Sequence, residues 1–145
     1  MFIENAETQE LISHLSPSGI NMLLIAEATP IDLDILIELA NKNGMTIAGA
    51  IFPKVFEGVN TYDEGIVLKH VKTDDTPVLL KHIGTGSLDL ELPDLAGTQS
   101  CIVFSDGLME NIPRMLERLY EKYWTNINFI GGGAGSLSLQ QQPCV

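Results

Sequence analysis

Basic residues are scarce in this sequence. Eight Lys and Arg stand against nineteen Asp and Glu among the 145 residues, which gives a formal net charge of -11 at pH 7. A surface this acidic repels the phosphates of nucleic acids and the headgroups of anionic lipids. We therefore expect neither a nucleic acid nor a membrane among its partners.

Cysteine and long apolar runs are also scarce. Only Cys101 and Cys144 are present, so a framework of several disulfides is excluded and we expect inert, buried thiols. No apolar run reaches the roughly 18 residues of a membrane span. The opening MFIENAETQE has neither the basic nor the apolar part of a signal peptide. These features predict a cytoplasmic protein.

The composition that remains is that of one globular domain, with 45% hydrophobic and 19% charged residues. Helix and strand patterns alternate along the chain, which predicts an α/β fold, with α+β as the alternative. We expect a mixed sheet of about six to seven strands with helices covering it. The predicted helices cover 6–16, 29–44 and a segment from about 111, and the clearest strands cover 20–28, 45–53, 100–107 and 127–133.

The second predicted helix has marked ends. Thr29 is a suitable cap, Pro30 suits the first helical position, and Gly44 suits the stop. A loop over 54–65 is expected to follow the next strand.

Two alternating runs, IVLKHVK and PVLLKHIG, predict an antiparallel hairpin near 64–84. In one register His70 pairs with Leu80 and Leu68 with His82, so both imidazoles share a face. A register shifted by one residue separates them. We expect no metal or other cofactor, but haem bound by His70 and His82 stays an alternative.

The chain closes on FIGGGAGSLSLQQQPCV, a strand that runs into a group of glycines. A phosphate-binding loop needs Gly-Lys-Ser/Thr at the start of a helix, and GGGAGS has no Lys. A dinucleotide-binding turn needs a helix after the glycines, whereas SLSLQQQ alternates as a strand does. Two interpretations stay open: exposed amides that bind a small polar or anionic ligand, or a bulge with tight backbone packing.

The stretch FSDG occupies a matching place. It ends one strand and precedes a helix, and the glycines end the strand after that helix. The carboxyl ends of two parallel strands joined in this way lie side by side, where ligands gather in α/β sheets. Asp106 has the alternative role of shaping a turn. The predicted ligand-binding residues are Ser105, Asp106, Gly107, Gly131, Gly132, Gly133, Gly135 and Ser136.

Support for catalysis is weak. Ser105, Ser136 and Ser138 lie near the predicted pocket, but the chain has no G-x-S-x-G elbow, and the sequence places no histidine to act as a base. We therefore expect no catalytic residues and no enzyme. A serine-dependent hydrolase stays an alternative.

The span from CIVFSDG to INFIGGGAGS resembles the FIST N-terminal domain, a sensory module of prokaryotic signal transduction proteins. Asp106-Gly107, the helix from about 111 and the turn from Gly131 to Gly135 carry the resemblance. Upstream, the strand, helix and strand over 20–53 fit the family's opening order, with IAGAIFP in place of its usual Gly-Cys/Ser-Ser/Thr turn.

The resemblance implies binding of a small molecule, such as an amino acid or related metabolite, and a signalling output such as a kinase or cyclase. Some members of the family are haem-linked nitric oxide sensors, which gives the haem alternative a family basis. Residues 137–145 are typical of a strand that begins rather than of a tail. We therefore expect residues 1–145 to be a single domain and the front part of a longer protein.

Overall fold

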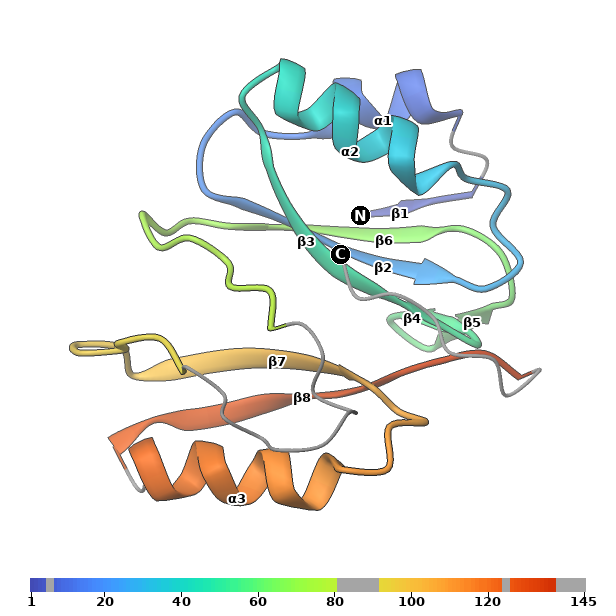
Figure 1. Ribbon diagram of the computed structural model, residues 1–145. Coiled ribbons are helices and arrows are strands. Elements are labelled where there is room, and N and C mark those ends of the chain that lie inside the picture. Colours follow the sequence, from blue (N-terminus) through green and yellow to red (C-terminus); the bar gives the residue numbers. More distant parts are fainter. Residues whose placement is uncertain (5–6, 81–91, 124–125, 138–145) are drawn as a thin grey trace.

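The computed structural model describes residues 1–4, 7–80, 92–123 and 126–137, and it confirms the predicted mixed α/β architecture (Figure 1). The helices and strands follow one another in alternation over most of this length. Their bounds are β1 Phe2–Ile3, α1 Thr8–His14, β2 Ile20–Ala26, α2 Leu33–Lys42, β3 Thr46–Phe52, β4 Val55–Glu57, β5 Asn60–Tyr62, β6 Ile66–Val71, β7 Ser100–Asp106, α3 Ile112–Tyr123 and β8 Asn128–Ala134.

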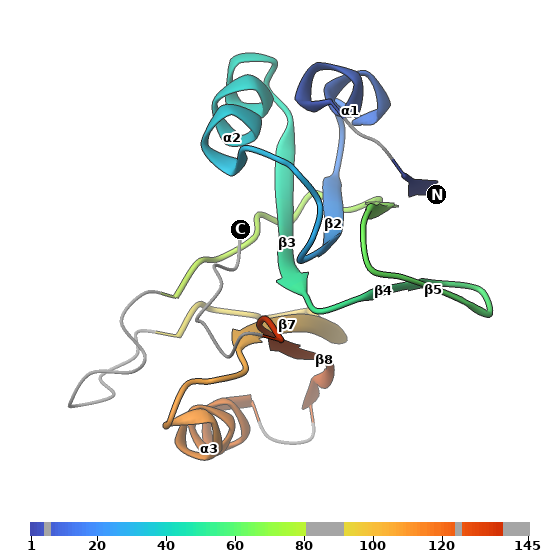
Figure 2. The same cartoon turned by 90° about the vertical axis from the view of Figure 1, so that its right-hand side faces the viewer.

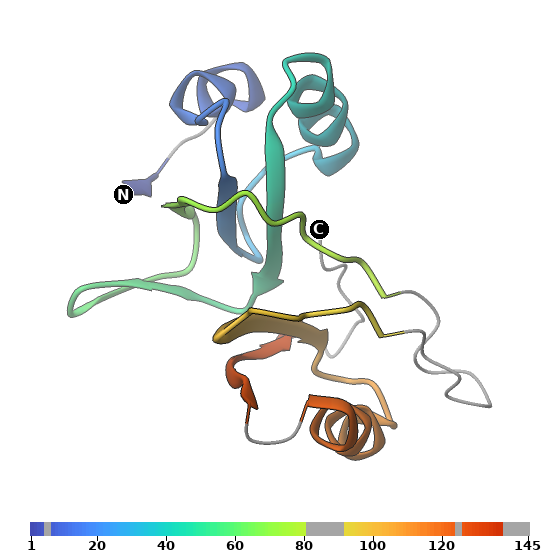
Figure 3. The same cartoon turned by 90° about the vertical axis from the view of Figure 1, so that its left-hand side faces the viewer.

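The described strands are divided among three sheets. A four-stranded mixed sheet has the order β1-β6-β2-β3, in which β2 and β3 are parallel and β6 is antiparallel to both of its neighbours. β4 and β5 form an antiparallel hairpin, and β7 and β8 form a parallel pair. Figure 3 shows α1 and α2 on one side of the molecule and α3 on the other, with the strands between them.

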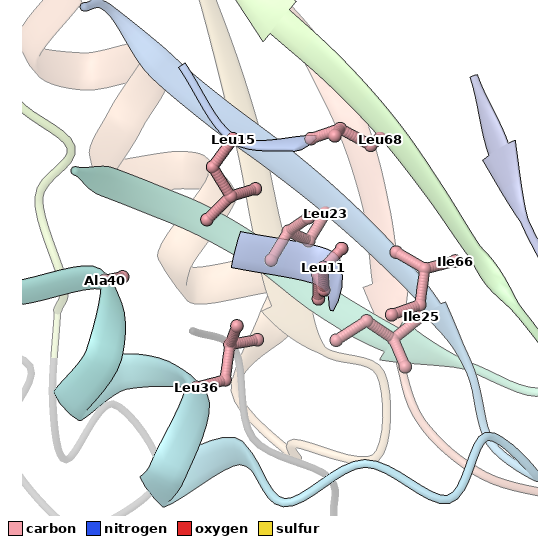
Figure 4. Close-up of a cluster of buried hydrophobic side chains, with 8 residues drawn as sticks. All are labelled: Leu11, Leu15, Leu23, Ile25, Leu36, Ala40, Ile66 and Leu68. Carbon is pink, nitrogen blue, oxygen red and sulfur yellow. The ribbon is translucent and has the colours of Figure 1, made fainter. Parts of the chain in front are cut away.

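The larger core lies between α1, α2 and the four-stranded sheet. Alternate residues of β2 point toward the two helices, as expected of a strand with one face on a core. All the buried members of this core are aliphatic, and hydrophobic burial of this kind is the main stabilising term of a fold. Figure 4 shows them: Leu11, Leu15, Leu23, Ile25, Leu36, Ala40, Ile66 and Leu68.

A smaller core lies between α3 and the β7–β8 pair. Met115, Leu119 and Tyr123 recur at helical spacing on α3 and are buried, so they form one apolar stripe. They pack with half-buried Cys101, and burial raises the pKa of its thiol. The Tyr123 hydroxyl donates a hydrogen bond to the carbonyl of Pro93, which ties the segment before β7 to the helix.

The hairpin predicted near 64–84 is not formed as expected. β6 lies between β1 and β2, where His70 is opposite Asn21 rather than Leu80. Residues 77–80 are not in a strand, and 81–84, with His82, lie outside the described residues. The hairpin is instead β4–β5, in the segment predicted as a loop. Gly58 takes a φ of 62° at the first position of its two-residue turn, a conformation that glycine adopts without strain.

The start of α2 also differs from the prediction. The cap is Asp32, whose Oδ1 accepts a hydrogen bond from the amide of Ile35 at 3.1 Å. Thr29 is buried, and its hydroxyl donates to the carbonyl of Gly65 at 3.0 Å and accepts from the amide of Gly65 at 2.9 Å. A side chain that could cap the helix is therefore used to join the loops after β2 and before β6.

Two strand-helix-strand units with matching geometry organise the molecule. We call β2, α2 and β3 the first unit and β7, α3 and β8 the second unit. In each unit the parallel strands pair over seven residues, and a glycine lies opposite the fourth residue of the first strand, Gly49 opposite Leu23 and Gly131 opposite Val103. In both glycines the position of a Cβ is already filled by the carbonyl oxygen of the opposite residue. Side chains at these positions would therefore separate the strands.

Candidate functional site

The two units meet at the carboxyl ends of their strands. Figure 2 faces these ends and shows β3 reaching the β7–β8 pair. The amide of Gly135, just after β8, donates a hydrogen bond to the carbonyl of Ile51 in β3 at 3.0 Å. The rings of Phe52 and Phe104 meet edge to face, with centroids 5.8 Å apart. Four strand ends thus form one junction, in the position where ligands bind in α/β sheets.

The predicted neighbourhood of Ser105 and Asp106 with the glycine run is present. In the parallel pair, Ser105 lies opposite Gly133 and Asp106 opposite Ala134. The amide of Gly107 donates to the carbonyl of Ala134 at 2.7 Å, which closes the end of the pair. The eight predicted ligand-binding residues therefore lie in the carboxyl-terminal halves of the neighbouring strands β7 and β8 and directly after them.

The glycines in β8 and directly after it have two kinds of surroundings. A Cβ on Gly131 or Gly133 would collide with backbone, that of Val103 in the first case and of Gly107 in the second. A Cβ on Gly132 or Gly135 would meet no atom of the described residues within 4 Å. The tight-packing interpretation therefore accounts for two of these glycines. Open space remains in front of the other two.

β8 has an edge that the described strands leave unused. In the part of the chain that the structure describes, β8 pairs only with β7. Alternate amides of a parallel strand point to opposite sides, so every second amide of β8 points away from β7. Gly131, Gly132 and Gly133 are exposed, and no side chain of their own shields these amides. This edge can donate hydrogen bonds to an anionic or polar group.

Asp106 shapes the turn that follows β7. Its Oδ1 accepts a hydrogen bond from the amide of Leu108 at 2.9 Å, and its carbonyl accepts from the amide of Met109 at 3.2 Å. The turn interpretation is therefore correct for one of its oxygens. The carboxylate is half-buried at the junction, where its second oxygen can accept a hydrogen bond from a ligand amine.

Ser105 precedes Asp106 at the end of β7, and Ser136 follows the end of β8 by two residues. Ser105 is half-buried beside Asp106, and Ser136 is buried with only 6% of its surface exposed. Ser138, the third candidate, lies outside the described residues.

Sequence reasoning missed Glu27. Its backbone amide donates to the carbonyl of Phe52 at 2.8 Å, and its Oε2 accepts from the amide of Leu137 at 2.8 Å. This half-buried residue joins the ends of β2 and β3 to the turn after β8. The signal was its position, because Glu27 directly follows β2 just as Asp106 ends β7. Each unit thus carries a carboxylate at the end of its first strand.

The described histidines lie far from the junction. His70 is exposed and opposite Asn21, at the amino end of β2, and His14 ends the helix that precedes this strand. The junction is at the opposite, carboxyl end of β2. His82 lies outside the described residues, so the pairing of His70 with His82 stays untested. Over the ranges the structure describes, no three His, Cys, Asp or Glu residues gather as a metal site.

A shallow, open hollow lies at the first turn of α2, where Asp32 and Thr29 contribute to its lining. Two of its three polar side chains are already engaged, since Asp32 caps the helix and Thr29 holds Gly65. We therefore place the candidate site at the junction. The hollow is lined by Thr29, Pro30, Ile31, Asp32, Leu33 and Asp34.

Comparison with models of protein families matches residues 23–145 to the FIST N domain. The match covers the first unit from the fourth residue of β2 onward and the whole of the second unit. No curated protein and no solved structure matches the chain. None of the helices in the described ranges is long and apolar enough to cross a membrane.

Proposed function

Because the chain belongs to the FIST N domain family, a sensory family of signal transduction proteins, we propose that it binds an amino acid or a related metabolite at the junction. The observation that carries the proposal is the edge of β8 that the described strands leave unpaired, with exposed glycines, at the end of a pair in which Asp106 lies opposite Ala134. The junction therefore offers both hydrogen-bond donors and an acceptor.

Such a pair of groups suits a zwitterion. Backbone amides without side chains around them hydrogen-bond a carboxylate, and a fixed carboxylate attracts an ammonium group. Asp106 is held in place by the amide of Leu108, so its second oxygen has a defined direction. A ligand with both groups on one small carbon frame uses both features at once.

Occupancy is then passed to an output protein or domain, such as a kinase or a cyclase. A ligand at this junction lies where the strand ends of the two units meet, so its binding changes the contacts between them. In this proposal residues 1–145 work as one sensory domain, without catalysis of their own.

A thermal-shift screen with the proteinogenic amino acids tests the proposal. A ligand that binds only the folded state raises the melting temperature in proportion to the logarithm of its concentration. Asp106→Ala is expected to abolish the rise and to lower the melting temperature of the free protein only slightly, through the loss of one turn hydrogen bond.

Asp74→Ala is the matched control, because Asp74 is an exposed aspartate in the segment after β6. It removes the same charge and is expected to leave the ligand response intact. A response that survives Asp106→Ala as well as Asp74→Ala would contradict the placement of the site.

A further inference from the structure

Glu27 makes a contact that resembles the proposed binding of a ligand. Its carboxylate accepts a hydrogen bond from the amide of Leu137, the residue that follows the glycine-rich end of β8 by three positions. We propose that Glu27 is an internal carboxylate that occupies this amide in the free domain and is displaced by the carboxylate of the ligand. This inference rests on the proposed function and names the group that the ligand must replace.

The geometry favours competition over a purely structural bond. The contact joins residues 110 positions apart at 2.8 Å, and it is exposed. A small carboxylate in solution can therefore reach the same amide. Carboxylate oxygens form charge-assisted hydrogen bonds to backbone amides, whether they belong to a side chain or to a ligand. Glu27 and the ligand thus offer the same chemical group to one donor.

Displacement has a structural consequence because Glu27 belongs to the first unit. Its backbone amide is bonded to the carbonyl of Phe52, and only its side chain reaches the turn after β8. When the side chain leaves Leu137, the first unit loses one of its links to the second unit. The bond from Gly135 to Ile51 and the contact of Phe52 with Phe104 remain.

This exchange converts binding into a change between the two units. In the free domain Glu27 fastens the turn after β8 to the end of β2. In the liganded domain that turn is held by the ligand instead of by Glu27. An internal competitor of this kind lowers the apparent affinity, because only the population with a free amide binds.

Titrations followed by NMR test the proposal, with acetate as the probe and acetamide as its uncharged counterpart. We expect acetate to shift the amide resonances of Leu137 and of residues 131–136 in the wild type. Glu27→Ala removes the competitor and is expected to tighten acetate binding by about fivefold, the worth of one exposed charge-assisted hydrogen bond. Acetamide is expected to bind weakly to both proteins, and Glu27→Ala is expected to change its affinity little.

Two further variants separate the hydrogen bond from the charge. Glu27→Gln keeps the size and an acceptor oxygen but loses the charge, so an intermediate gain is expected. Glu38→Ala removes the same charge from an exposed position of α2 and is expected to leave acetate binding unchanged. An equal gain in Glu38→Ala would show that net charge, rather than displacement, explains the effect.

The outcomes distinguish this inference from the function on which it rests. If acetate shifts residues 131–136 but Glu27→Ala binds it no more tightly than the wild type, the displacement is wrong and the binding site stands. If acetate shifts no amide of 131–137 in either protein, both proposals are wrong. Circular dichroism of each variant checks that the fold is intact before the titrations are compared.

Discussion

The first and second units share their strand register but differ in how completely they are buried. In the first unit Leu36 on α2 has no exposed surface, and its neighbours form the aliphatic core with α1 and β6. In the second unit α3 covers only one face of its sheet. On the other face Ile102 and Ile130, which lie opposite each other, are 48% and 65% exposed.

We infer from this difference that the two units contribute differently to stability and to the proposed binding. Burial on the scale of the first core supplies most of the stability of a small domain. The second unit has fewer buried apolar residues, and it presents the glycine edge and Asp106. The first unit therefore serves as the rigid support, and the second carries most of the groups proposed to bind.

The largest effect on stability is expected from replacing one buried leucine on the helix of each unit, α2 in the first and α3 in the second. Leu36→Ala removes a side chain with no exposed surface and is expected to lower the free energy of unfolding by about 4 kcal/mol. Leu119→Ala, at a position already 7% exposed in the smaller core, is expected to cost about 2 kcal/mol. Urea unfolding followed by circular dichroism measures both.

Leu116→Ala, on the outer side of α3 at 41% exposure, is the control and is expected to cost less than about 1 kcal/mol. Equal losses in Leu36→Ala and Leu119→Ala would contradict the assignment of stability to the first unit.

A smaller effect is expected from alanine at the paired glycines. Gly131→Ala places a methyl group where the carbonyl oxygen of Val103 lies, so the strands must separate, at a cost of about 1–3 kcal/mol. Gly49→Ala meets the same obstacle at Leu23 and is expected to cost as much. Thermal unfolding of the two variants measures whether the units are equivalent at this position.

Gly132→Ala is the neighbouring control, because nothing lies within 4 Å of its Cβ. It is expected to change the free energy of unfolding by less than about 0.5 kcal/mol. If Gly132→Ala is as harmful as Gly131→Ala, the close approach of the strands does not explain the glycines.

The smallest effect is a loss of stability at alkaline pH. It is expected in the smaller core, which contains ionisable side chains, and not in the aliphatic larger core. Burial raises the pKa of Cys101 above 9.0, and burial, with the negative charges of Cys101 and Asp94, raises the pKa of Tyr123 above 10.0. The folded state thus holds these protons more tightly than the unfolded chain. The contribution of these two groups to stability is therefore fully present below their ordinary pKa values and is lost as the pH rises through the raised values.

Melting temperatures between pH 7 and pH 10.5 measure this loss. The variant with Cys101→Ala and Tyr123→Phe lacks both groups and is expected to show a smaller alkaline decrease than the wild type. Hydrogen exchange is expected to locate the loss in α3 and β7, since the buried side chains of the larger core do not ionise. Identical slopes in the two proteins would contradict this origin.

The second unit could be predicted well from the sequence. The sequence shows a strand that ends in Asp106, then a helix, then a strand that ends in glycines. Parallel strands joined by a helix place their carboxyl ends together, so the relative position of these two ends is largely determined. The closeness of Asp106 to the glycine run followed from this order, and the structure adds the register, with Asp106 opposite Ala134. Local patterns were enough wherever the partners lay within one unit.

The rest of the site could not be predicted, because it depends on contacts between distant segments. The bond from Leu137 to Glu27 spans 110 residues, and no local pattern specifies it. Thr29 has the right type to cap a helix, but tertiary structure uses its hydroxyl for Gly65. Likewise β6 pairs with β2, a strand about 40 residues earlier in the sequence, rather than with the segment that directly follows it, as the hairpin prediction assumed.

The three glycines of β8 also affect the tendency of this protein to aggregate at high concentration. Unpaired strand edges next to exposed apolar side chains, such as Ile130, are places where chains add to one another and aggregate. Stacks of strands grow poorly on glycine, which has no side chain to pack and loses much backbone entropy when ordered. Gly131, Gly132 and Gly133 therefore keep an edge open to a small molecule and make it a poor template for another copy of the chain.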